Sequence, residues 1–250
     1  MTNLVIDIGN SFTKIAIFKN DDLLKVEQYE KPEIADVYKF PNEFPIDRVI
    51  ISSVKKEYDA REDWMLALEA EFNATFFNSS ISAGVKNHYK TPHTLGADRF
   101  AAVIGARYLY PGQNSIIISG GTCITYDHVD EAANYFGGSI SPGLNMRYKA
   151  VNHYTAALPL LQADEAFDAP YGDNTESAIR SGVQNGIKYE LEGFIKNYIK
   201  AGTAYNIILC GGDSIFFDTL LKNSIFAPYV KIEPYLVLKG LNAAIQSNND

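Results

Sequence analysis

Two stretches of the chain share one pattern, in which a β-branched run enters a glycine turn and a second β-branched run leaves it. They cover residues 4–18 and residues 115–127. Such runs on either side of a glycine turn predict a β-hairpin. Superposing the two stretches aligns Gly9 with Gly121 and Thr13 with Thr125. A chain that carries the same hairpin twice is predicted to contain two related halves.

The boundary between the halves is predicted at a break in the pattern. Turn-forming residues at 110–114 come directly before the second hairpin. The expected halves are residues 1–112 and residues 113–250. A length of 250 residues and an apolar content of 46% are enough for two compact domains, each with its own core.

A third buried strand is predicted at residues 206–210, and it ends in a further glycine turn at 211–212. Helical spacing of apolar residues covers 64–72, 99–109 and 175–199. Strands that alternate with helices in this way predict an α/β fold. Three glycine turns at strand ends favour one shared cleft.

The composition narrows the classes of partner and compartment. With 30 acidic and 22 basic residues the formal charge is -8, which repels a polyanion, so nucleic acid is not an expected partner. The two cysteines, Cys123 and Cys210, lack metal-ligand spacing, and the four histidines form no ligand pair. No export signal opens the sequence, and no apolar run is long enough to span a bilayer. We expect a cytoplasmic protein without a membrane partner or a transition-metal site.

Asp7 lies at the end of the first predicted strand, two residues before Gly9. A carboxylate beside a glycine turn suits Mg²⁺ with a polyphosphate, because it orients the hydrated cation while backbone N–H groups and the Ser11 hydroxyl face the phosphate. Lys14 adds a positive charge. An aspartate in a hairpin turn is also common as a structural feature, but the second hairpin favours a phosphate site. The sequence has neither a Walker A loop nor a dinucleotide-binding glycine fingerprint.

The segment 89–99 leads into the second predicted helix. Asp98 has two interpretations there. It is the N-cap of the helix, or its carboxylate holds a substrate hydroxyl. The neighbouring Gly96 and Arg99 fit the second use, because a guanidinium group orients an anionic or polar substrate.

Two further features keep two interpretations each. Gly182 and Gly186, four residues apart in the long predicted helix, allow close approach either to the protein's own sheet or to a second subunit. The segment 137–143 either lines a pocket with backbone donors or is a turn before the following helix.

The paired hairpins resemble those of the actin-like, sugar-kinase and heat-shock ATPase superfamily. That resemblance implies an α/β fold of two duplicated ribonuclease H-like domains with a cleft between them, and ATP as the ligand. From residue 5 to residue 245 the chain more specifically resembles the type III pantothenate kinases. The matching pieces are Asp7–Ser11, Ile51–Val54, Tyr89 with Gly96–Arg99, Gly121–Asp127, Gly137–Gly143, Asn174–Thr175, Ser181–Gly182 and Gly211–Gly212.

The resemblance to this family implies ATP-dependent phosphorylation of pantothenate to 4'-phosphopantothenate, the first step of coenzyme A biosynthesis, by a homodimer. The residues that it implies for ATP are Asp7, Ile8, Gly9, Asn10, Ser11, Phe12, Thr13 and Lys14 of the first hairpin and Thr122 of the second. Those that it implies for pantothenate are Tyr89, Gly96, Ala97, Asp98 and Arg99, with Asp98 as proton acceptor, and Thr175 from the neighbouring subunit. The N-terminal half then carries the first phosphate hairpin and the substrate loop, and the C-terminal half carries the second hairpin, the 211–212 nucleotide turn and the dimer helix.

The same resemblance carries the metal expectations. It implies Mg²⁺ with ATP, positioned by Asp7 through water. Where relatives have an aspartate that ligates an activating monovalent cation, K⁺ or NH₄⁺, this chain has Ser119. A neutral hydroxyl offers the ion only a dipole, so we expect a weaker or altered cation requirement, with Asp127 as the residue that could compensate.

Two other functions stay open on the sequence alone. One is another small-metabolite or sugar kinase of the superfamily, which would share the ATP-binding element. The other is a regulatory protein that binds ATP without catalysis, although the presence of both Asp98 and Arg99 argues against it.

Overall fold

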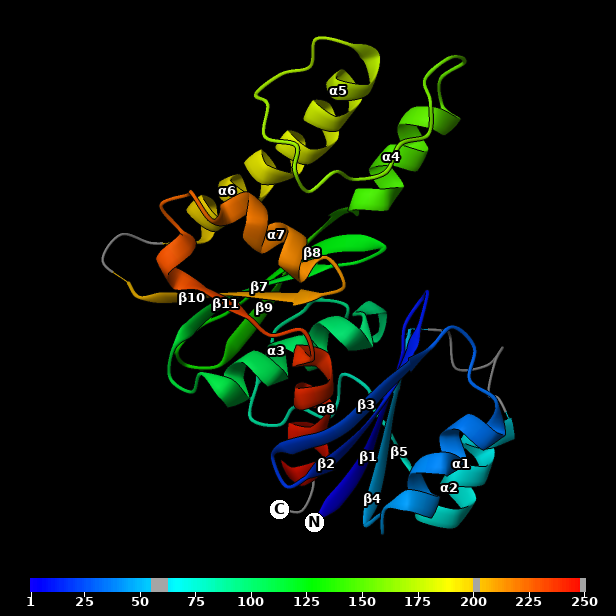
Figure 1. Ribbon diagram of the computed structural model, residues 1–250. Helices are drawn as coiled ribbons and strands as arrows, with labels where there is room; N and C mark the ends of the chain where they lie inside the picture. The colour runs from blue at the N-terminus through cyan, green and yellow to red at the C-terminus, as the bar shows by residue number, and fades with distance from the viewer. Residues whose placement is uncertain (55–62, 200–202, 248–250) are drawn as a thin grey trace. The chain divides into compact units, whose positions relative to one another are not determined.

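The computed structural model describes residues 1–54, 63–199 and 203–247. The chain forms two compact units, neither of which is continuous in sequence. The first unit comprises Met1–Pro111, Ala133–Phe136 and Tyr235–Asp250, and the second comprises Gly112–Ala132 and Gly137–Pro234. Both units combine strands with helices, which confirms the α/β prediction (Figure 1).

The first unit is built on a five-stranded mixed sheet in the order β3-β2-β1-β4-β5. β1 is antiparallel to β2 and parallel to β4, β2 is antiparallel to β3, and β4 is parallel to β5. The central strand β1 is almost entirely buried, as expected for a strand with neighbours on both sides and helices on both faces. The strands are β1 Thr2–Ile8, β2 Thr13–Lys19, β3 Asp22–Tyr29, β4 Arg48–Ser53 and β5 Thr75–Phe76.

The second unit repeats this strand order. Its sheet is arranged β11-β10-β7-β8-β9, and β6 pairs with Asn134 and Tyr135, the first residues of β9, which belong to the first unit as β6 does. β7 is antiparallel to β8 and parallel to β10, and β10 is parallel to β11, so β7 takes the place that β1 has in the first sheet. The strands are β6 Lys86–Asn87, β7 Asn114–Gly120, β8 Cys123–Val129, β9 Asn134–Pro142, β10 Tyr205–Gly211 and β11 Val230–Ile232.

Both predicted hairpins are present, but their turns differ in length. In the first hairpin Ile8 is opposite Thr13. The superposition matches Ile8 with Gly120. In the second hairpin, Gly120 is opposite Ile124. The second turn is therefore one residue shorter, and the predicted match of Thr13 with Thr125 is wrong by one position.

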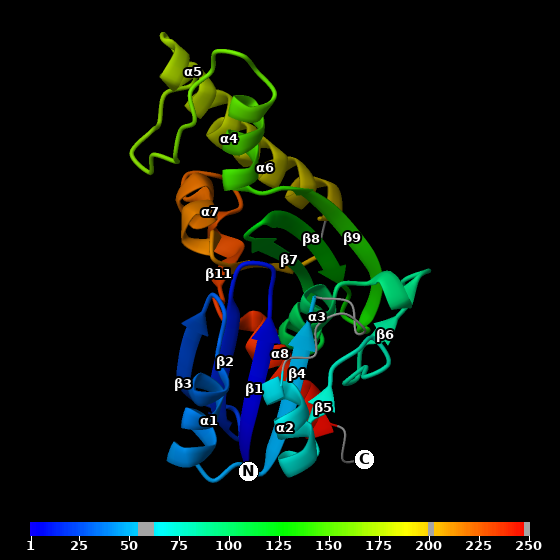
Figure 2. The same ribbon diagram turned by 90° about the vertical axis from the view of Figure 1, so that its right-hand side faces the viewer.

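Helices cover both faces of the first sheet (Figures 1 and 2). Leu4 and Ile6 of β1 share a core cluster with residues of α1 and α2, whereas Nδ2 of Asn3 donates to Oδ1 of Asn242 in α8 at 2.8 Å. Because side chains alternate along a strand, Asp7 lies on the α8 face of β1. The helices of this unit are α1 Ile34–Glu43, α2 Asp63–Phe72, α3 Ala97–Leu109 and α8 Leu236–Ser247.

α3 and α8 approach closely where both carry glycine. A Cβ atom on Gly105 would lie 2.5 Å from the carbonyl oxygen of Leu236, and one on Gly240 would lie 1.8 Å from that of Ala101. Only glycine permits this spacing. α8 thus packs in the first unit although it ends the chain, so the compact units divide the chain differently from the halves 1–112 and 113–250, which stay a prediction from the sequence repeat.

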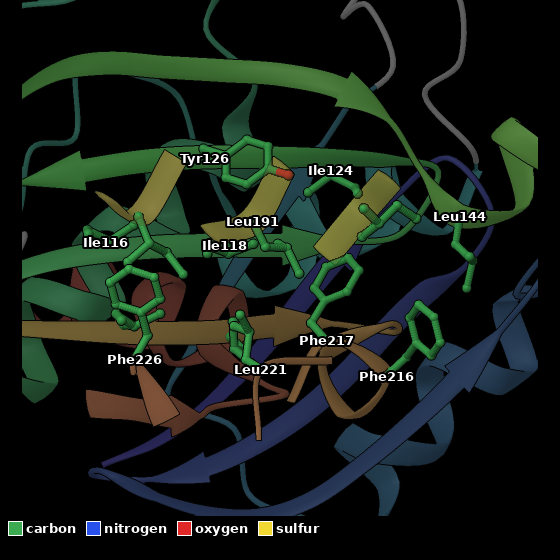
Figure 3. Close-up of a cluster of buried hydrophobic side chains, with 14 of the residues drawn as sticks. Ile116, Ile118, Ile124, Tyr126, Leu144, Leu191, Phe216, Phe217, Leu221 and Phe226 are labelled. Atoms are coloured by element: carbon green, nitrogen blue, oxygen red, sulfur yellow. The ribbon is translucent and has the colours of Figure 1, made fainter. Parts of the chain in front are cut away.

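The core of the second unit lies between its sheet and the helices α4, α5, α6 and α7 (Figure 3). Ile118 of β7 and Ile124 of β8 are fully buried there together with Leu191 of α6 and Phe217 of α7. Burial of large apolar side chains, each contributing about 2 kcal/mol, holds these layers together. The helices of this unit are α4 Leu144–His153, α5 Thr175–Arg180, α6 Gly186–Tyr198 and α7 Ser214–Leu221.

Three local predictions are corrected by the structure. The segment 137–142 continues strand β9 instead of forming a loop, and it begins with Gly137 at a φ of 118°. The helix predicted at 175–199 contains a π-helical turn, Ser181–Asn185, between α5 and α6. The helix expected from residue 99 begins two residues earlier, at Ala97. Short 3₁₀ turns occur at Pro92–Thr94 and Ala227–Tyr229.

Candidate active site

Asp7 is a buried carboxylate in the first hairpin. It is opposite Lys14 of β2 and beside Ser52 of β4. The residue is 8% exposed, and its Oδ1 atom has no hydrogen-bond partner among the described residues. A buried carboxylate oxygen without a partner is costly. Such an atom fits a hydrated cation, whose bound water would supply the missing donor.

The charge state of Asp7 depends on its neighbours. Burial raises the pKa of Asp7 to about 6, and the charge of Asp98 acts in the same direction. Lys14 and Ser52 act in the opposite direction without cancelling these effects. Asp7, Lys14 and Asp98 are therefore close enough for their charges to interact, all within the first unit. The structure thus brings the first hairpin and the segment 89–99 to one place, and a raised carboxylate pKa is frequent in functional sites.

The turn of the first hairpin leaves its polar groups accessible. The Gly9 N–H donates to the Phe12 carbonyl at 3.0 Å, which closes the turn. A Cβ atom on Gly9 would lie 3.1 Å from the same oxygen, so a larger residue would crowd it. Asn10, Ser11 and Phe12 are exposed, whereas Thr13 returns the chain to the core. An exposed turn with outward donors can accept an anionic ligand.

Asp98 lies in the first turn of α3, and Gly96 occupies the N-cap position. The interpretation of Asp98 as the N-cap is therefore wrong. Its Oδ1 atom accepts a hydrogen bond from the Arg99 N–H at 2.9 Å. A Cβ atom on Gly96 would lie 2.6 Å from that same Oδ1 atom. Glycine at position 96 leaves the space that the Asp98 carboxylate occupies.

Aromatic contacts hold the side chain of Tyr89. Its ring is nearly parallel to that of Tyr135, with centroids 6.3 Å apart, and the Arg99 guanidinium lies 5.8 Å from its centroid. Arg99 is 6% exposed and Tyr135 is fully buried. Stacking of a guanidinium on an aromatic ring fixes both groups. Tyr89, Asp98 and Arg99 thus belong to one cluster within the first unit.

In the second unit, three chain segments meet at the turn between β7 and β8. The Gly143 N–H donates to the Thr122 carbonyl at 3.1 Å, and the Asp213 N–H donates to the Gly120 carbonyl at 3.3 Å. A Cβ atom on Gly211 would lie 2.2 Å from the Gly120 carbonyl oxygen. The predicted nucleotide turn at 211–212 and the predicted phosphate turn at Thr122 are therefore adjacent.

Ser119 and Asp127 lie on the same face of the second sheet. Ser119 is opposite Thr125, and Asp127 is opposite Ile117. Asp127 is 1% exposed. No cluster of three or more histidine, cysteine or acidic side chains with metal-binding geometry occurs in the part of the chain that the structure describes.

Thr175 is not brought to the Thr122 turn within the second unit. It is exposed at the start of α5, where Asn174 accepts a hydrogen bond from the Ser177 N–H at 3.0 Å and acts as the N-cap. α5 lies beyond α4 and α6, away from β7 and β8 (Figure 1).

Several residues of these clusters carry no predicted role in the sequence analysis. Ser52 lies within a segment that matches the family, yet the sequence alone does not show that it faces Asp7. Tyr135 lacks a local signal, because its contact with Tyr89 depends on pairing between β6 and β9. Glu190 has the spacing of an ordinary polar residue on an amphipathic helix. Its partners come from three other elements.

The fold and these clusters define a class of protein. A two-unit α/β chain with the same strand order in both sheets, and a glycine-turn hairpin at the start of each, has the two-domain actin-like fold. Solved structures support this fold assignment. A putative Baf family transcriptional activator from Campylobacter jejuni is 22% identical with a TM-score of 0.62, covering 98% of both chains. A putative 2-dehydro-3-deoxygalactonokinase from Sinorhizobium meliloti is 12% identical with a TM-score of 0.58, covering 99% of both.

Sequence comparison identifies the family within this class. The family described as type III pantothenate kinase matches residues 3–197. A type III pantothenate kinase of Phocaeicola vulgatus is 40% identical over 247 residues, which is 99% of each chain. This chain belongs to the type III pantothenate kinase family, which confirms the resemblance, the two-domain actin-like fold and the enzyme class predicted from the sequence.

Family membership also decides between the functions that the sequence left open. The protein is an ATP-dependent kinase that phosphorylates pantothenate in coenzyme A biosynthesis, and as a kinase it uses a divalent metal with ATP. Among the described residues, the helices are too short or too polar for one of them to cross a membrane.

Replacing Asp7 by asparagine is predicted to stabilise the ligand-free protein at neutral pH. Folding raises the pKa of Asp7 in the wild-type protein. The folded protein therefore binds the proton of the Asp7 carboxyl group more tightly than the unfolded chain does. The stability that this proton contributes is complete at a pH below 3.8, the pKa of Asp7 in the unfolded chain. It is lost as the pH rises through about 6, the pKa of Asp7 in the folded protein. At pH 7 the variant should be more stable by at most about 3 kcal/mol.

Denaturant unfolding of both proteins across this pH range, with a chelator present, measures the effect. The advantage of Asp7→Asn should grow as the pH rises. An advantage that does not change with pH would show that Asp7 is not the titrating group.

Proposed function

We propose that Asp98 holds and deprotonates the hydroxyl of pantothenate while Asp7 positions the metal that accompanies ATP. The observation that carries this assignment is the electrostatic interaction between the two carboxylates in the first unit. Two acidic groups kept within range of each other repel, so their proximity costs stability, and such pairs are frequent in functional sites. In this proposal Asp7 supplies a site for a cation, and Asp98 supplies a site for a proton.

In this proposal Asp98 acts mainly by orientation. Phosphoryl transfer proceeds through a loose transition state, so little charge builds on the attacking oxygen before the bond to the leaving group lengthens. An alcohol is far less acidic than a carboxylic acid, and the proton therefore moves late. The Arg99 N–H bond to Asp98 and the space left at Gly96 support a fixed carboxylate orientation. A fixed acceptor lowers the entropic cost of aligning the hydroxyl.

The ATP phosphates are proposed to lie against the first hairpin, from Asp7 to Lys14, and against Thr122 of the second. The exposed turn of the first hairpin and the unpartnered Oδ1 atom of Asp7 support this role. Mg²⁺ bound to the phosphates would contact Asp7 through water and would offset the phosphate charge during transfer.

Pantothenate is proposed to lie against Tyr89 and the segment Gly96–Arg99. The stacked Tyr89 ring offers an apolar surface, and the Arg99 guanidinium offers a positive charge for polar or anionic groups of the substrate. Ala97 contributes only backbone at the start of α3.

The Asp98→Asn variant is predicted to lower kcat by at least about a hundredfold while leaving ATP binding nearly unchanged, because asparagine keeps the shape but cannot accept the proton. ADP release from ATP and Mg²⁺, measured with and without pantothenate, reports the rate. Asp22→Asn, which removes an exposed carboxylate from β3 of the same unit, is the matched control. A normal rate in Asp98→Asn would refute the assignment.

We further propose that the requirement for K⁺ or NH₄⁺ is weak in this protein. Ser119 offers the cation a neutral oxygen, and Asp127 on the same sheet face supplies a charge two positions along the ladder. Turnover should differ by less than about twofold between K⁺, NH₄⁺ and Na⁺ buffers, since a cation that binds weakly contributes little to turnover. Ser119→Asp should increase the preference for K⁺. A strong K⁺ requirement in the wild-type protein would contradict the proposal.

A homodimer in which Thr175 reaches the neighbouring active site is the proposed assembly. Exposed apolar side chains on and beside α4 and α6, among them Met146, Tyr154 and Tyr189, support an interface there.

Sedimentation should give a dimer. Asp98→Asn and Thr175→Ala chains, mixed in equal amounts and refolded together, should give about a quarter of the wild-type activity. Half of the dimers are then mixed, and one of the two sites in each mixed dimer is intact. Recovery of no activity would place Thr175 in its own subunit's site.

The expectations that the protein works in the cytoplasm and has no nucleic-acid partner rest on the sequence alone. The charge of -8 supports the second of these.

A further inference from the structure

An ion pair in the second unit joins α4 to α6. Nη2 of Arg147 lies 2.6 Å from Oε2 of Glu190, and the two side chains are 19% and 23% exposed. This pair is more buried than Lys39–Glu27 in the first unit or Arg180–Glu176 in α5. Ion pairs that lose more water interact more strongly and cost more to break.

Glu190 and Arg147 each make further hydrogen bonds. Oε1 of Glu190 accepts from the Tyr126 hydroxyl at 2.7 Å and from the Ser141 hydroxyl at 2.5 Å. Nε of Arg147 donates to the Pro142 carbonyl at 2.8 Å. Burial raises the pKa of Glu190, but the bonds from Ser141, Arg147 and Tyr126 outweigh it and hold that pKa below its usual range. Glu190 is therefore ionised at neutral pH.

These contacts hold the end of β9 where it meets the phosphate turn of the second unit. Ser141 and Pro142 directly precede Gly143, whose N–H donates to the Thr122 carbonyl at 3.1 Å. A Cβ atom on Gly143 would lie 2.2 Å from the Gly121 carbonyl oxygen, so the two segments are in tight contact. A shift of Pro142 would therefore move the Thr122 turn.

A second connection reaches the same turn along β8. Tyr126 is four residues after Thr122, and its ring is fully buried in the core of the second unit (Figure 3). Its hydroxyl is anchored on Glu190. The carboxylate thus contacts both the strand that leaves the Thr122 turn and the strand that packs against it.

We propose that Arg147 and Glu190 are positioning residues for ATP, which fix the Thr122 turn by holding Ser141 and Pro142 against it. The inference rests on the proposed contact between Thr122 and ATP. Neither side chain touches the nucleotide in this account. Their effect is to keep the donors of the turn aligned before ATP binds, so less ordering is left to the binding step.

The geometry requires an arginine at position 147. Its planar group donates from Nε to Pro142 and from Nη2 to Glu190 and, at 3.2 Å, to Ser141. A lysine ammonium can keep the attraction to Glu190 but lacks this fixed fork, and a methionine keeps only the volume of the stem. The three side chains form a graded series.

The test compares Arg147→Lys, Arg147→Met and Glu190→Gln with the wild-type protein. A non-hydrolysable ATP analogue, titrated without pantothenate, should bind about tenfold more weakly to Arg147→Met and Glu190→Gln, with Arg147→Lys between them and the wild type. The KM for ATP should rise in the same order. The KM for pantothenate and kcat at saturating ATP should stay within about twofold, because Asp98 and Tyr89 are untouched.

Lys39→Met is the control, because it breaks the more exposed ion pair with Glu27 in the first unit. It should change neither the analogue affinity nor the KM for ATP. Thermal unfolding of every variant is recorded, and all assays are run well below the lowest Tm so that only folded protein is compared.

Lower Tm values with an unchanged affinity for the analogue would overturn the inference and leave a purely structural ion pair. If Arg147→Met does not fold, Arg147→Lys and Glu190→Gln decide the question, since they keep the volume and some of the hydrogen bonds. Failure of the proposed function is a separate result. It would appear as wild-type protein that binds the analogue but releases no ADP when pantothenate is added.

Discussion

The loss of water around Asp7 is the constraint on which the first unit depends. β1 has a neighbour on each side and helices on both faces, so a carboxylate near its end is buried as soon as the unit folds. α3 then brings Asp98 into range, which adds repulsion, and among the described residues Lys14 and Ser52 oppose these effects. A chain optimised for stability alone would have neutral residues at these positions. The arrangement is stable enough only because the surrounding sheet and helices bury so much apolar surface.

In the second unit, close backbone packing instead of charge holds the turn that corresponds to the first hairpin. Its Ser119 is neutral, and the turn between β7 and β8 is held by backbone contacts from Gly143 and Gly211 that no larger residue would permit. Its ionised group, Glu190, lies in a network of donors, where it is satisfied. The two related hairpins have thus diverged in their electrostatics while their sheets kept the same strand order.

Local patterns predicted much of this protein. The hairpins at Gly9 and Gly121, the α/β class and the family all follow from short segments whose signals do not depend on distant parts of the chain. Features that depend on distant pairing could not be predicted in this way. The segment 137–142 suggested a loop because its glycines and proline are turn signals, although it continues β9 beside the preceding strand β8. Asp98 suggested a cap because only the structure shows that Gly96 takes that position. The partners of Glu190 come from β8, β9 and α4, and no single segment contains that information.

The place of α8 has a consequence for how the protein is made. During synthesis β1 precedes the second unit, whereas Asn242, its hydrogen-bond partner, and Gly240, which lies against α3, follow the second unit. Because α8 is made after Pro234, the last residue of the second unit, the sheet of the first unit lacks one of its covering helices while the second unit is already complete. The order of synthesis is thus the opposite of the order in which the two units can finish folding.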